Sequence, residues 1–250
     1  MDGVKKRILL TGCEFENMHR GFIGGYFNEL YKDKYEIVVF NEDIRWAIWD
    51  QVLDGIDMVV HLAALAGVRR SHEIPNEYWE TNVVASKELF LVCEQEAIPI
   101  IYASSSSVYE WWLSPYAASK WAMEHHAPDC SLGLRFHTVY GKNSRKDMLY
   151  DKLLNHDVEY ITNHTRDWTH VEDVCSAIDI CIENFHEISQ VAHWLDVGNG
   201  KPVSVKEMAN HVWPNNNLRL KDVSGEREHT CADPTLLLQY GWEPKHYILD

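Results

Sequence analysis

The sequence predicts an α/β fold built on a doubly wound parallel sheet, and three observations carry this prediction. Short apolar runs alternate with longer helical patterns over the amino-terminal half of the chain, which is the order found in parallel sheets. The runs are apolar at nearly every position, as in strands that are buried on both faces. Several of them end in glycine, alanine or serine, and such small residues let a ligand approach the carboxyl ends of the strands.

The composition is that of a folded, acidic globular protein. Its 250 residues suit one large domain, or one domain with a small appendage, and 46% of them are apolar. The formal net charge of −15 argues against nucleic acid and anionic membranes as partners, because both require basic surfaces. No apolar run is long enough to span a bilayer, and residues 1–7 lack a signal-peptide core, so we expect a cytoplasmic protein.

The cysteines and histidines predict neither disulfides nor a metal site. The six cysteines include no Cys-x-x-Cys pair and are expected to be reduced thiols. Among the 14 histidines, no spacing is typical of metal ligands. We therefore expect no metal, and we expect His125, His126, His164 and His170 to be surface or packing residues.

The first apolar run, residues 7–12, ends at Gly12 and is followed by a glycine-rich turn that enters a helix near Gly21. Strand, glycine loop and helix N-terminus form the phosphate-binding arrangement of dinucleotide folds. Gly21 and Gly24 fit the second half of a Gly-x-x-Gly-x-x-Gly loop, but residues 13–20 separate them from Gly12. This motif alone is weak, and an ordinary strand, turn and helix would explain it equally well.

The second strand, residues 35–40, gives a weak indication of the nucleotide. In dinucleotide folds an acidic residue at the end of this strand holds the ribose hydroxyls of adenosine. Asn41 stands at that position and can donate and accept hydrogen bonds. No arginine directly follows the strand to pair with a 2′-phosphate, so the sequence favours NAD over NADP.

The remaining elements continue the alternation, and the pattern loosens beyond Gly141. Further strands are expected at residues 57–64, 98–103, 132–136 and 193–198. Helices are expected at residues 48–53, 77–96, 115–128, 147–155, 167–184 and 204–212, and near Leu236.

Tyr116 and Lys120 are one helical turn apart and share a face of the helix that starts near Pro115. A tyrosine hydroxyl has a pKa near about 10, and a neighbouring ammonium favours the phenolate and lowers that pKa. Ser105, at the end of the preceding strand, could share the proton of a substrate hydroxyl. Together the three groups could take a proton from an alcohol while a hydride leaves its carbon. A buried tyrosine with a solvated lysine would explain the pair alone.

In their order along the chain, these motifs resemble the extended short-chain dehydrogenase/reductase family, and within it the NAD-dependent nucleotide-sugar epimerases and dehydratases. The resemblance rests on Thr11-Gly12, Gly21-Phe22-Ile23-Gly24, residues 61–69, Asn82-Val83, residues 102–109, residues 116–120 and Arg166-Asp167. Residues 66–69, and residues 135–141 followed by 144–148, are most similar to UDP-glucuronate 4-epimerases.

The resemblance implies a Rossmann-type fold, NAD as cofactor and a small C-terminal α/β part that binds the nucleotide sugar. It places NAD binding in residues 1–140 and 168–198, and substrate binding in residues 141–167 and 199–250. It implies a cytoplasmic isomerase of carbohydrate metabolism whose partner is a UDP-sugar, and it allows a homodimer.

Carried over position by position, the resemblance also implies the site residues. Tyr116 is expected to be the general base, Ser105 its hydroxyl partner, and Lys120 its electrostatic partner and a ligand of the nicotinamide ribose. The other residues expected to bind the cofactor are Gly12, Gly21, Phe22, Ile23, Gly24, Asn41, Asp43, Ile44, Leu62, Ala63, Ala64, Leu65 and Asn82. The residues expected to bind the substrate are Arg69, Ser106, Ser107, Thr138, Arg145, Arg166 and Glu226, with Arg145 on the carboxylate of a uronate.

The expected reaction is 4-epimerisation of a UDP-sugar, with UDP-glucuronate favoured, through a 4-keto intermediate that is reduced again on the opposite face. The alternatives are a dehydratase or decarboxylase and an NADPH-dependent reductase of the same family, or a catalytically impaired nucleotide-binding protein. Ser106 and Ser107 stand where dehydratases and decarboxylases carry acidic residues, which favours epimerisation. A protein that only binds a nucleotide would not need Ser105, Tyr116 and Lys120 together.

The chain also departs from the family pattern. The glycine loop is longer, a strand after residues 35–40 is expected to be missing, and the segment between Tyr109 and Tyr116 is short. The helix of Tyr116 is expected to end near Pro128, which would weaken a dimer interface made of paired helices.

Overall fold

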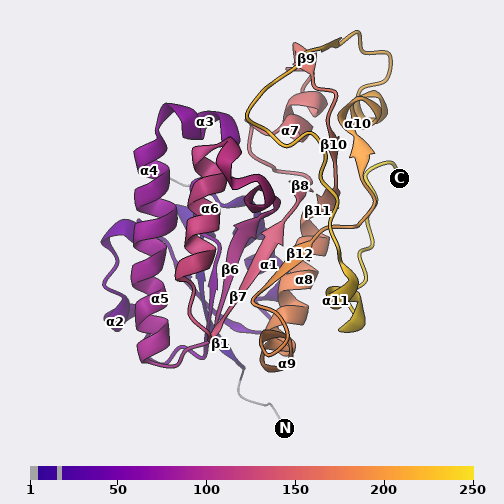
Figure 1. Ribbon diagram of the computed structural model, residues 1–250. Coiled ribbons are helices and arrows are strands. Elements are labelled where there is room, and N and C mark those ends of the chain that lie inside the picture. The colour runs from indigo at the N-terminus through magenta and orange to yellow at the C-terminus, as the bar shows by residue number, and fades with distance from the viewer. Residues whose placement is uncertain (1–4, 16–18) are drawn as a thin grey trace.

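The computed structural model describes residues 5–15 and 19–250 and confirms the predicted parallel sheet. Its six strands run in the order β12-β7-β6-β5-β1-β4, and all neighbouring pairs are parallel (Figure 1). The strands are β1 (Arg7–Thr11), β4 (Glu36–Phe40), β5 (Met58–His61), β6 (Ile100–Ser105), β7 (Ser131–Phe136) and β12 (Trp194–Val197). The order reverses at β1, between β4 and β5, and ligands of such sheets bind at this switch point.

Helices cover both faces of the sheet (Figure 1). One face carries α1 (Phe22–Tyr31), α8 (Val171–Glu183) and α9 (Phe185–Ser189). The other carries α2 (Trp49–Val52), α4 (Pro75–Trp79), α5 (Ser86–Gln95) and α6 (Pro115–His126), with α3 (Val68–Glu73) beside α6. Because successive strand residues point to opposite faces, Ile8 and Leu10 join the core under α1 and α8, whereas Leu9 joins the core under α5.

The long helix predicted at residues 77–96 is a composite. A π-helical segment, η2 (Glu80–Ala85), joins α4 to α5 and contains Asn82. Such single π-helical turns occur frequently at functional sites, because they re-aim one side chain out of the helical register.

The extra residues of the glycine loop form a short hairpin. Strands β2 (Glu14–Phe15) and β3 (His19–Arg20) pair antiparallel, and residues 16–18 lie outside the described part. The Gly21 N–H donates to the Cys13 carbonyl at 2.7 Å and closes the base of the hairpin. The insertion therefore leaves the end of β1 and the start of α1 next to each other.

The strand expected to be missing is absent from the described chain. After β4, which forms an edge of the sheet, only the short helix η1 (Ile44–Trp46) precedes α2.

The C-terminal part is built from short elements around a third apolar cluster that includes Tyr140, Trp168 and Met208. Three two-stranded sheets pair β8 (Thr138–Tyr140) with β11 (Trp168–His170), β10 (Thr165–Arg166) with β13 (Val203–Ser204), and β9 (Tyr160–Ile161) with β14 (Arg219–Leu220). The helices of this part are α7 (Leu149–Leu154), α10 (Val205–Val212) and α11 (Thr235–Gln239). The remaining helix, η3 (Ser106–Leu113), follows β6 in the sheet domain. The division into cofactor-binding and substrate-binding parts stays a prediction.

Buried Asp167 joins separate segments of this region. Its carboxylate accepts hydrogen bonds from the N–H groups of Asn199 and Gly200, each at 2.8 Å, and of Ala232, at 2.9 Å. This carboxylate fixes where the C-terminal segment passes the sheet. Within residues 5–15 and 19–250, no helix is both long and apolar enough to cross a membrane.

Candidate active site

The site lies where the carboxyl end of β6 meets the N-terminus of α6. Ser105 is the last residue of β6, and its hydroxyl accepts a hydrogen bond from the Ser107 N–H at 3.1 Å. Helix α6 begins with Pro115 in its first turn, and the hydroxyl of its N-cap, Ser114, accepts from the Ala117 N–H at 3.1 Å. These local rules place Tyr116 in the first turn, facing the strand end.

Ser105 and Tyr116 lie where the end of β6 meets the start of α6. Burial raises the pKa of Tyr116, whereas a hydrogen bond with the Ser105 side chain and the charge of Arg145 lower it. Tyr116 also packs edge-on against Tyr78, with ring centroids 6.1 Å apart. The charge of Arg145 therefore acts in the direction expected of Lys120, whose role as electrostatic partner of Tyr116 stays a prediction.

Lys120 is buried and points back to the strand that carries Ser105. Its Nζ donates to the Ala103 carbonyl at 2.8 Å. Burial lowers the pKa of Lys120 to about 7, although the charge of Glu124 acts in the opposite direction. The amine is therefore poised to gain or lose a proton near neutral pH.

Replacing Lys120 with methionine is expected to stabilise the protein more at pH 6 than at pH 10. The folded-state pKa of about 7 lies below the value of about 10.4 for an unfolded lysine. Between these two values the unfolded state binds more protons, so the wild-type protein gains stability as the pH rises. Urea unfolding at pH 6, 8 and 10 measures the difference. Lys32→Met, at an exposed position, is the control, and an equal effect of Lys120→Met at every pH would contradict the burial argument.

The three predicted glycines of the cofactor loop are in contact despite the hairpin between them. A Cβ at Gly21 would lie 1.9 Å from the Gly12 carbonyl oxygen, and one at Gly24 would lie 2.5 Å from the same atom. Gly12 has a φ of +74°, and a Cβ there would lie 2.5 Å from the Ala63 N. Only glycine lets these backbones approach so closely.

This packing fits the pyrophosphate of a dinucleotide. The first turn of α1 starts at the end of β1, and a helix N-terminus offers N–H groups that have no partner within the helix. No acidic residue lies in that turn to repel a phosphate. Phe22 and Ile23, also predicted here, pack partly against the core under α1.

A buried histidine that the sequence did not single out supports the loop after β5. The two ring nitrogens of His61 lie 2.8 Å from the Thr11 hydroxyl and 3.0 Å from the Ser86 hydroxyl. The Thr11 hydroxyl in turn accepts from the Ala63 N–H at 3.1 Å. Burial, and then the charge of Lys120, lower the pKa of His61 to about 3, so the ring is neutral and acts as a spacer between β1 and α5.

Asn82, predicted to bind the cofactor, makes its hydrogen bonds within the protein. Its amide oxygen accepts from the Leu65 N–H at 2.8 Å, and its amide nitrogen donates to the Leu65 carbonyl at 2.9 Å and to the Ser119 hydroxyl at 3.0 Å. Asn82 therefore fixes the end of the segment that holds Leu62, Ala63, Ala64 and Leu65 against α6.

The residues predicted to contact adenosine lie beyond β4. Asn41 is exposed, and the Asp43 carboxylate accepts from the Arg45 N–H at 3.0 Å and pairs with its guanidinium. These hydrogen bonds hold the pKa of Asp43 below its usual range. The Ile44 side chain is buried in the core under α5, so only its main chain remains for a ligand.

A polar cleft opens beside Ser105. The predicted residues that line it are Ser105, Ser106, Ser107, Thr138, Arg166 and Glu226. Arg69 is not in this lining but reaches it through Glu226, whose carboxylate lies 3.1 Å from the Arg69 Nε. Arg145 is also outside the lining, and its Nε and Nη2 donate to the two Asp147 carboxylate oxygens at 3.0 and 3.3 Å.

Sequence reasoning missed several lining residues, among them Phe136, His137, Arg227 and Thr230. Arg227 is the most informative of them, because its Nη1 donates to the Ser106 carbonyl at 2.9 Å and its guanidinium lies over the Tyr109 ring. Its position directly after Glu226 is the one signal in the sequence that could have indicated it.

Comparison with known proteins places this geometry in a family context. Residues 19–195 match the profile of the NAD dependent epimerase/dehydratase family. An uncharacterized protein of Methanocaldococcus jannaschii is 30% identical over 73% of this chain and 67% of its own length. The uncharacterized UDP-glucose epimerase YtcB of Bacillus subtilis is 27% identical over 88% of this chain and 83% of its own length.

Among solved structures, MoeE5 in complex with UDP-glucuronic acid and NAD is 26% identical to this chain. The TM-score is 0.79, and the alignment covers 97% of this chain and 95% of MoeE5. MoeE5 has also been solved with UDP-glucose and NAD.

Proposed function

Because this chain belongs to the NAD-dependent epimerase/dehydratase family, we propose that it is a 4-epimerase of UDP-sugars, with UDP-glucuronate as the favoured substrate. Membership of this family indicates an NAD-dependent enzyme that acts on nucleotide sugars. The observation that carries the proposed reaction is that the end of β6, with Ser105, meets the first turn of α6, with Tyr116, beside a cleft lined by two arginines, Arg166 and Arg227.

When bound, NAD supplies a reversible hydride acceptor for the sugar carbon that is oxidised. Tyr116 takes the proton of the sugar O4 in the oxidation and returns it after the 4-keto sugar has turned over. Ser105 bridges this proton transfer, because its hydroxyl can both donate and accept. The Ser105 bond and the Arg145 charge offset part of the effect of burial on the phenol.

The arginines around the cleft suit a diphosphate. Arg166 and Arg227 line it and Arg69 stands beside it, and guanidinium groups bind phosphate oxygens with paired hydrogen bonds. In the structure Glu226 lies 3.1 Å from Arg69 and 3.5 Å from Arg166, so its carboxylate balances their charge.

The hydroxyl groups beside Ser105, and the pairing of the cleft carboxylates with arginines, favour epimerisation over dehydration. Dehydration at the sugar needs an acid or base for a second proton transfer. Ser106 and Ser107 follow Ser105 and carry hydroxyl groups. The carboxylates that line the cleft, Glu110 and Glu226, both lie beside arginines, Glu110 at 3.8 Å from Arg227.

Arg145 supports the choice of a uronate. Its guanidinium already binds a carboxylate, that of Asp147, through two hydrogen bonds, and its charge acts on Tyr116. A uronate carboxylate could exchange with Asp147 on the same pair of N–H donors.

We expect Arg145→Ala to lower kcat/KM for UDP-glucuronate by about 10²-fold, because charged hydrogen bonds contribute about 1.5–3 kcal/mol. The kcat/KM for UDP-glucose should fall less, since with this sugar only the effect of the Arg145 charge on Tyr116 is lost. Arg145→Lys, which keeps the charge but loses the paired geometry, should fall in between. Steady-state kinetics with both sugars measure this. An equal loss on both sugars would show that Arg145 does not select the carboxylate.

The proposed reaction is tested by incubating the purified protein with UDP-glucuronate, UDP-glucose and UDP-N-acetylglucosamine. Products are identified by NMR, and the bound cofactor by mass spectrometry. We expect tightly bound NAD and a C4 epimer from UDP-glucuronate. A dehydrated or decarboxylated product, or turnover that requires external NADPH, would replace the proposal with one of the sister reactions. Bound NAD without any product would identify a nucleotide-binding protein.

A further inference from the structure

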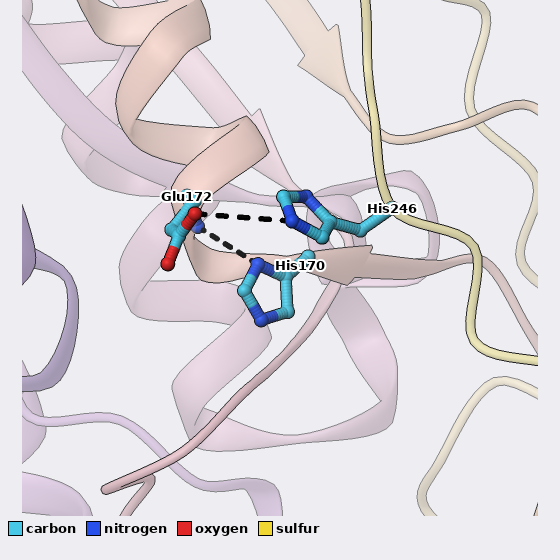
Figure 2. A group of neighbouring side chains, drawn as sticks. All are labelled: His170, Glu172 and His246. Atoms are coloured by element: carbon cyan, nitrogen blue, oxygen red, sulfur yellow. Dashed lines mark hydrogen bonds and ion pairs between the residues drawn. The ribbon is translucent and has the colours of Figure 1, made fainter. Parts of the chain in front are cut away.

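Two histidines and a glutamate gather at the N-terminus of α8 (Figure 2). His170 ends β11, Glu172 lies in the first turn of α8, and His246 comes from the C-terminal tail. The two imidazole rings lie against each other with centroids 4.1 Å apart. One possible ligand atom from each residue lies within 4.8 Å of the other two.

The hydrogen bonds indicate which nitrogen lone pairs face the centre of this group. The His170 Nδ1 lone pair points toward the start of α8, where it accepts a long hydrogen bond from the Glu172 N–H at 3.3 Å, and a metal ion bound at this nitrogen would replace that bond. The His246 Nδ1 lies 3.1 Å from an Asp173 carboxylate oxygen and, in the neutral ring, donates to it. The His246 Nε2 lone pair then faces the Glu172 carboxylate at 3.8 Å (Figure 2).

Asp173 holds His246 as outer carboxylates hold metal-binding histidines. Its side chain is only 3% exposed, and it accepts hydrogen bonds from the N–H groups of Lys245 and His246, each at 2.9 Å. A carboxylate on the far nitrogen fixes the tautomer and orientation of the ring and makes its other nitrogen a stronger ligand.

We propose that His170, Glu172 and His246 bind one divalent transition-metal ion, for which Zn²⁺ is the best match, and that the ion ties the C-terminal tail to α8. Two imidazoles and one carboxylate are a common Zn²⁺ ligand set, with water completing the tetrahedron. Ligand atoms around Zn²⁺ lie about 3.4 Å apart, so the three side chains must move closer. The Glu172 and His246 side chains are 45% and 40% exposed and have room to do so.

The charges around the site agree with a structural ion. A cation is disfavoured at a helix N-terminus, but Glu172 and Asp173 both place carboxylates in the first turn of α8. None of the three ligands lines the cleft beside Ser105, so the ion has no part in the reaction proposed above. We expect its effect on stability rather than on turnover.

The test is a Zn²⁺ titration of the EDTA-treated protein with its cofactor bound, followed by calorimetry and by thermal unfolding with and without Zn²⁺. We expect one tight site per chain and a rise in Tm on adding Zn²⁺. His246→Ala and Glu172→Gln should each weaken this binding at least about 10-fold and remove the rise in Tm. His186→Ala, which removes a histidine from α9, is the matched control and should keep both.

Binding that is equally strong in His246→Ala and Glu172→Gln would overturn the proposal, because it would show adventitious binding by other histidines among the 14. Absence of tight binding to the wild-type protein would overturn it as well. If His246→Ala does not fold, Glu172→Gln and His170→Gln decide the question.

Discussion

Tyr116→Phe is expected to lower kcat by about 10³-fold while leaving bound NAD in place, because the change removes the proton acceptor and nothing else. The phenylalanine ring keeps the edge-on contact with Tyr78 and the position in the first turn of α6. Only the hydroxyl, whose pKa Ser105 helps to lower, is lost. Single-turnover kinetics with UDP-glucuronate and mass spectrometry of the bound cofactor measure the two properties separately.

Tyr35→Phe is the matched control for this variant. The Tyr35 hydroxyl lies 2.7 Å from carboxylate oxygens of both Asp179 and Glu183 on α8, on the opposite face of the sheet, and donates its one proton between them. We expect this control to lose some stability and to keep wild-type turnover. Turnover by Tyr116→Phe at more than about a tenth of the wild-type rate would remove Tyr116 from the chemistry.

Gly21→Ala is expected to destabilise the protein by about 3 kcal/mol or more and to abolish NAD binding. The new Cβ would lie 1.9 Å from the Gly12 carbonyl oxygen, which is backbone and has no rotamer to change. The end of β1 and the start of α1 must then separate, and that junction is where the pyrophosphate is expected. Urea unfolding and cofactor content measure the two effects.

Gly241→Ala is the control for Gly21→Ala, because it adds backbone strain without a steric clash. Gly241 also has a positive φ, +83°, but a Cβ there would meet no atom within 4 Å. We expect a loss of about 1 kcal/mol and full NAD content. If Gly21→Ala behaves like this control, the hairpin rather than the glycine contact holds the loop together.

Much of the central sheet could be predicted from the sequence, because its strands are buried on both faces and read as continuous apolar runs. The run at residues 7–12 became β1 (Arg7–Thr11), and the run at 98–103 became β6 (Ile100–Ser105). The hairpin of β2 and β3 could not be predicted, since backbone pairing over two residues per strand leaves no hydrophobic pattern. The π-helical turn at Asn82 was hidden for a similar reason, because it lies inside a continuous helical pattern.

Local spacing in the sequence predicted only part of the candidate site. The four-residue interval between Tyr116 and Lys120 gave the shared helix face, but it could not show that burial and the Ala103 carbonyl would hold the amine. The charge of Arg145 acts on Tyr116 from a loop beyond the sheet. Arg227 reaches Ser106 from far along the chain.

The histidine cluster could not be predicted from local spacing either. We expected His170 to be a packing residue and found no metal-binding spacing in the sequence. His246 completes the cluster from the C-terminal tail, and only the fold brings it beside β11 and α8.

Incubation with UDP-glucuronate that carries deuterium at C4 tests most directly whether Tyr116 and Ser105 serve a reversible oxidation at that carbon. The protein is used as purified, with its own bound NAD and no added cofactor, and the products are followed by NMR. We expect the C4 epimer to form with the deuterium retained at C4. Loss of the deuterium from the product would contradict this mechanism. So would a substrate that stays unchanged although the protein is folded and has NAD bound.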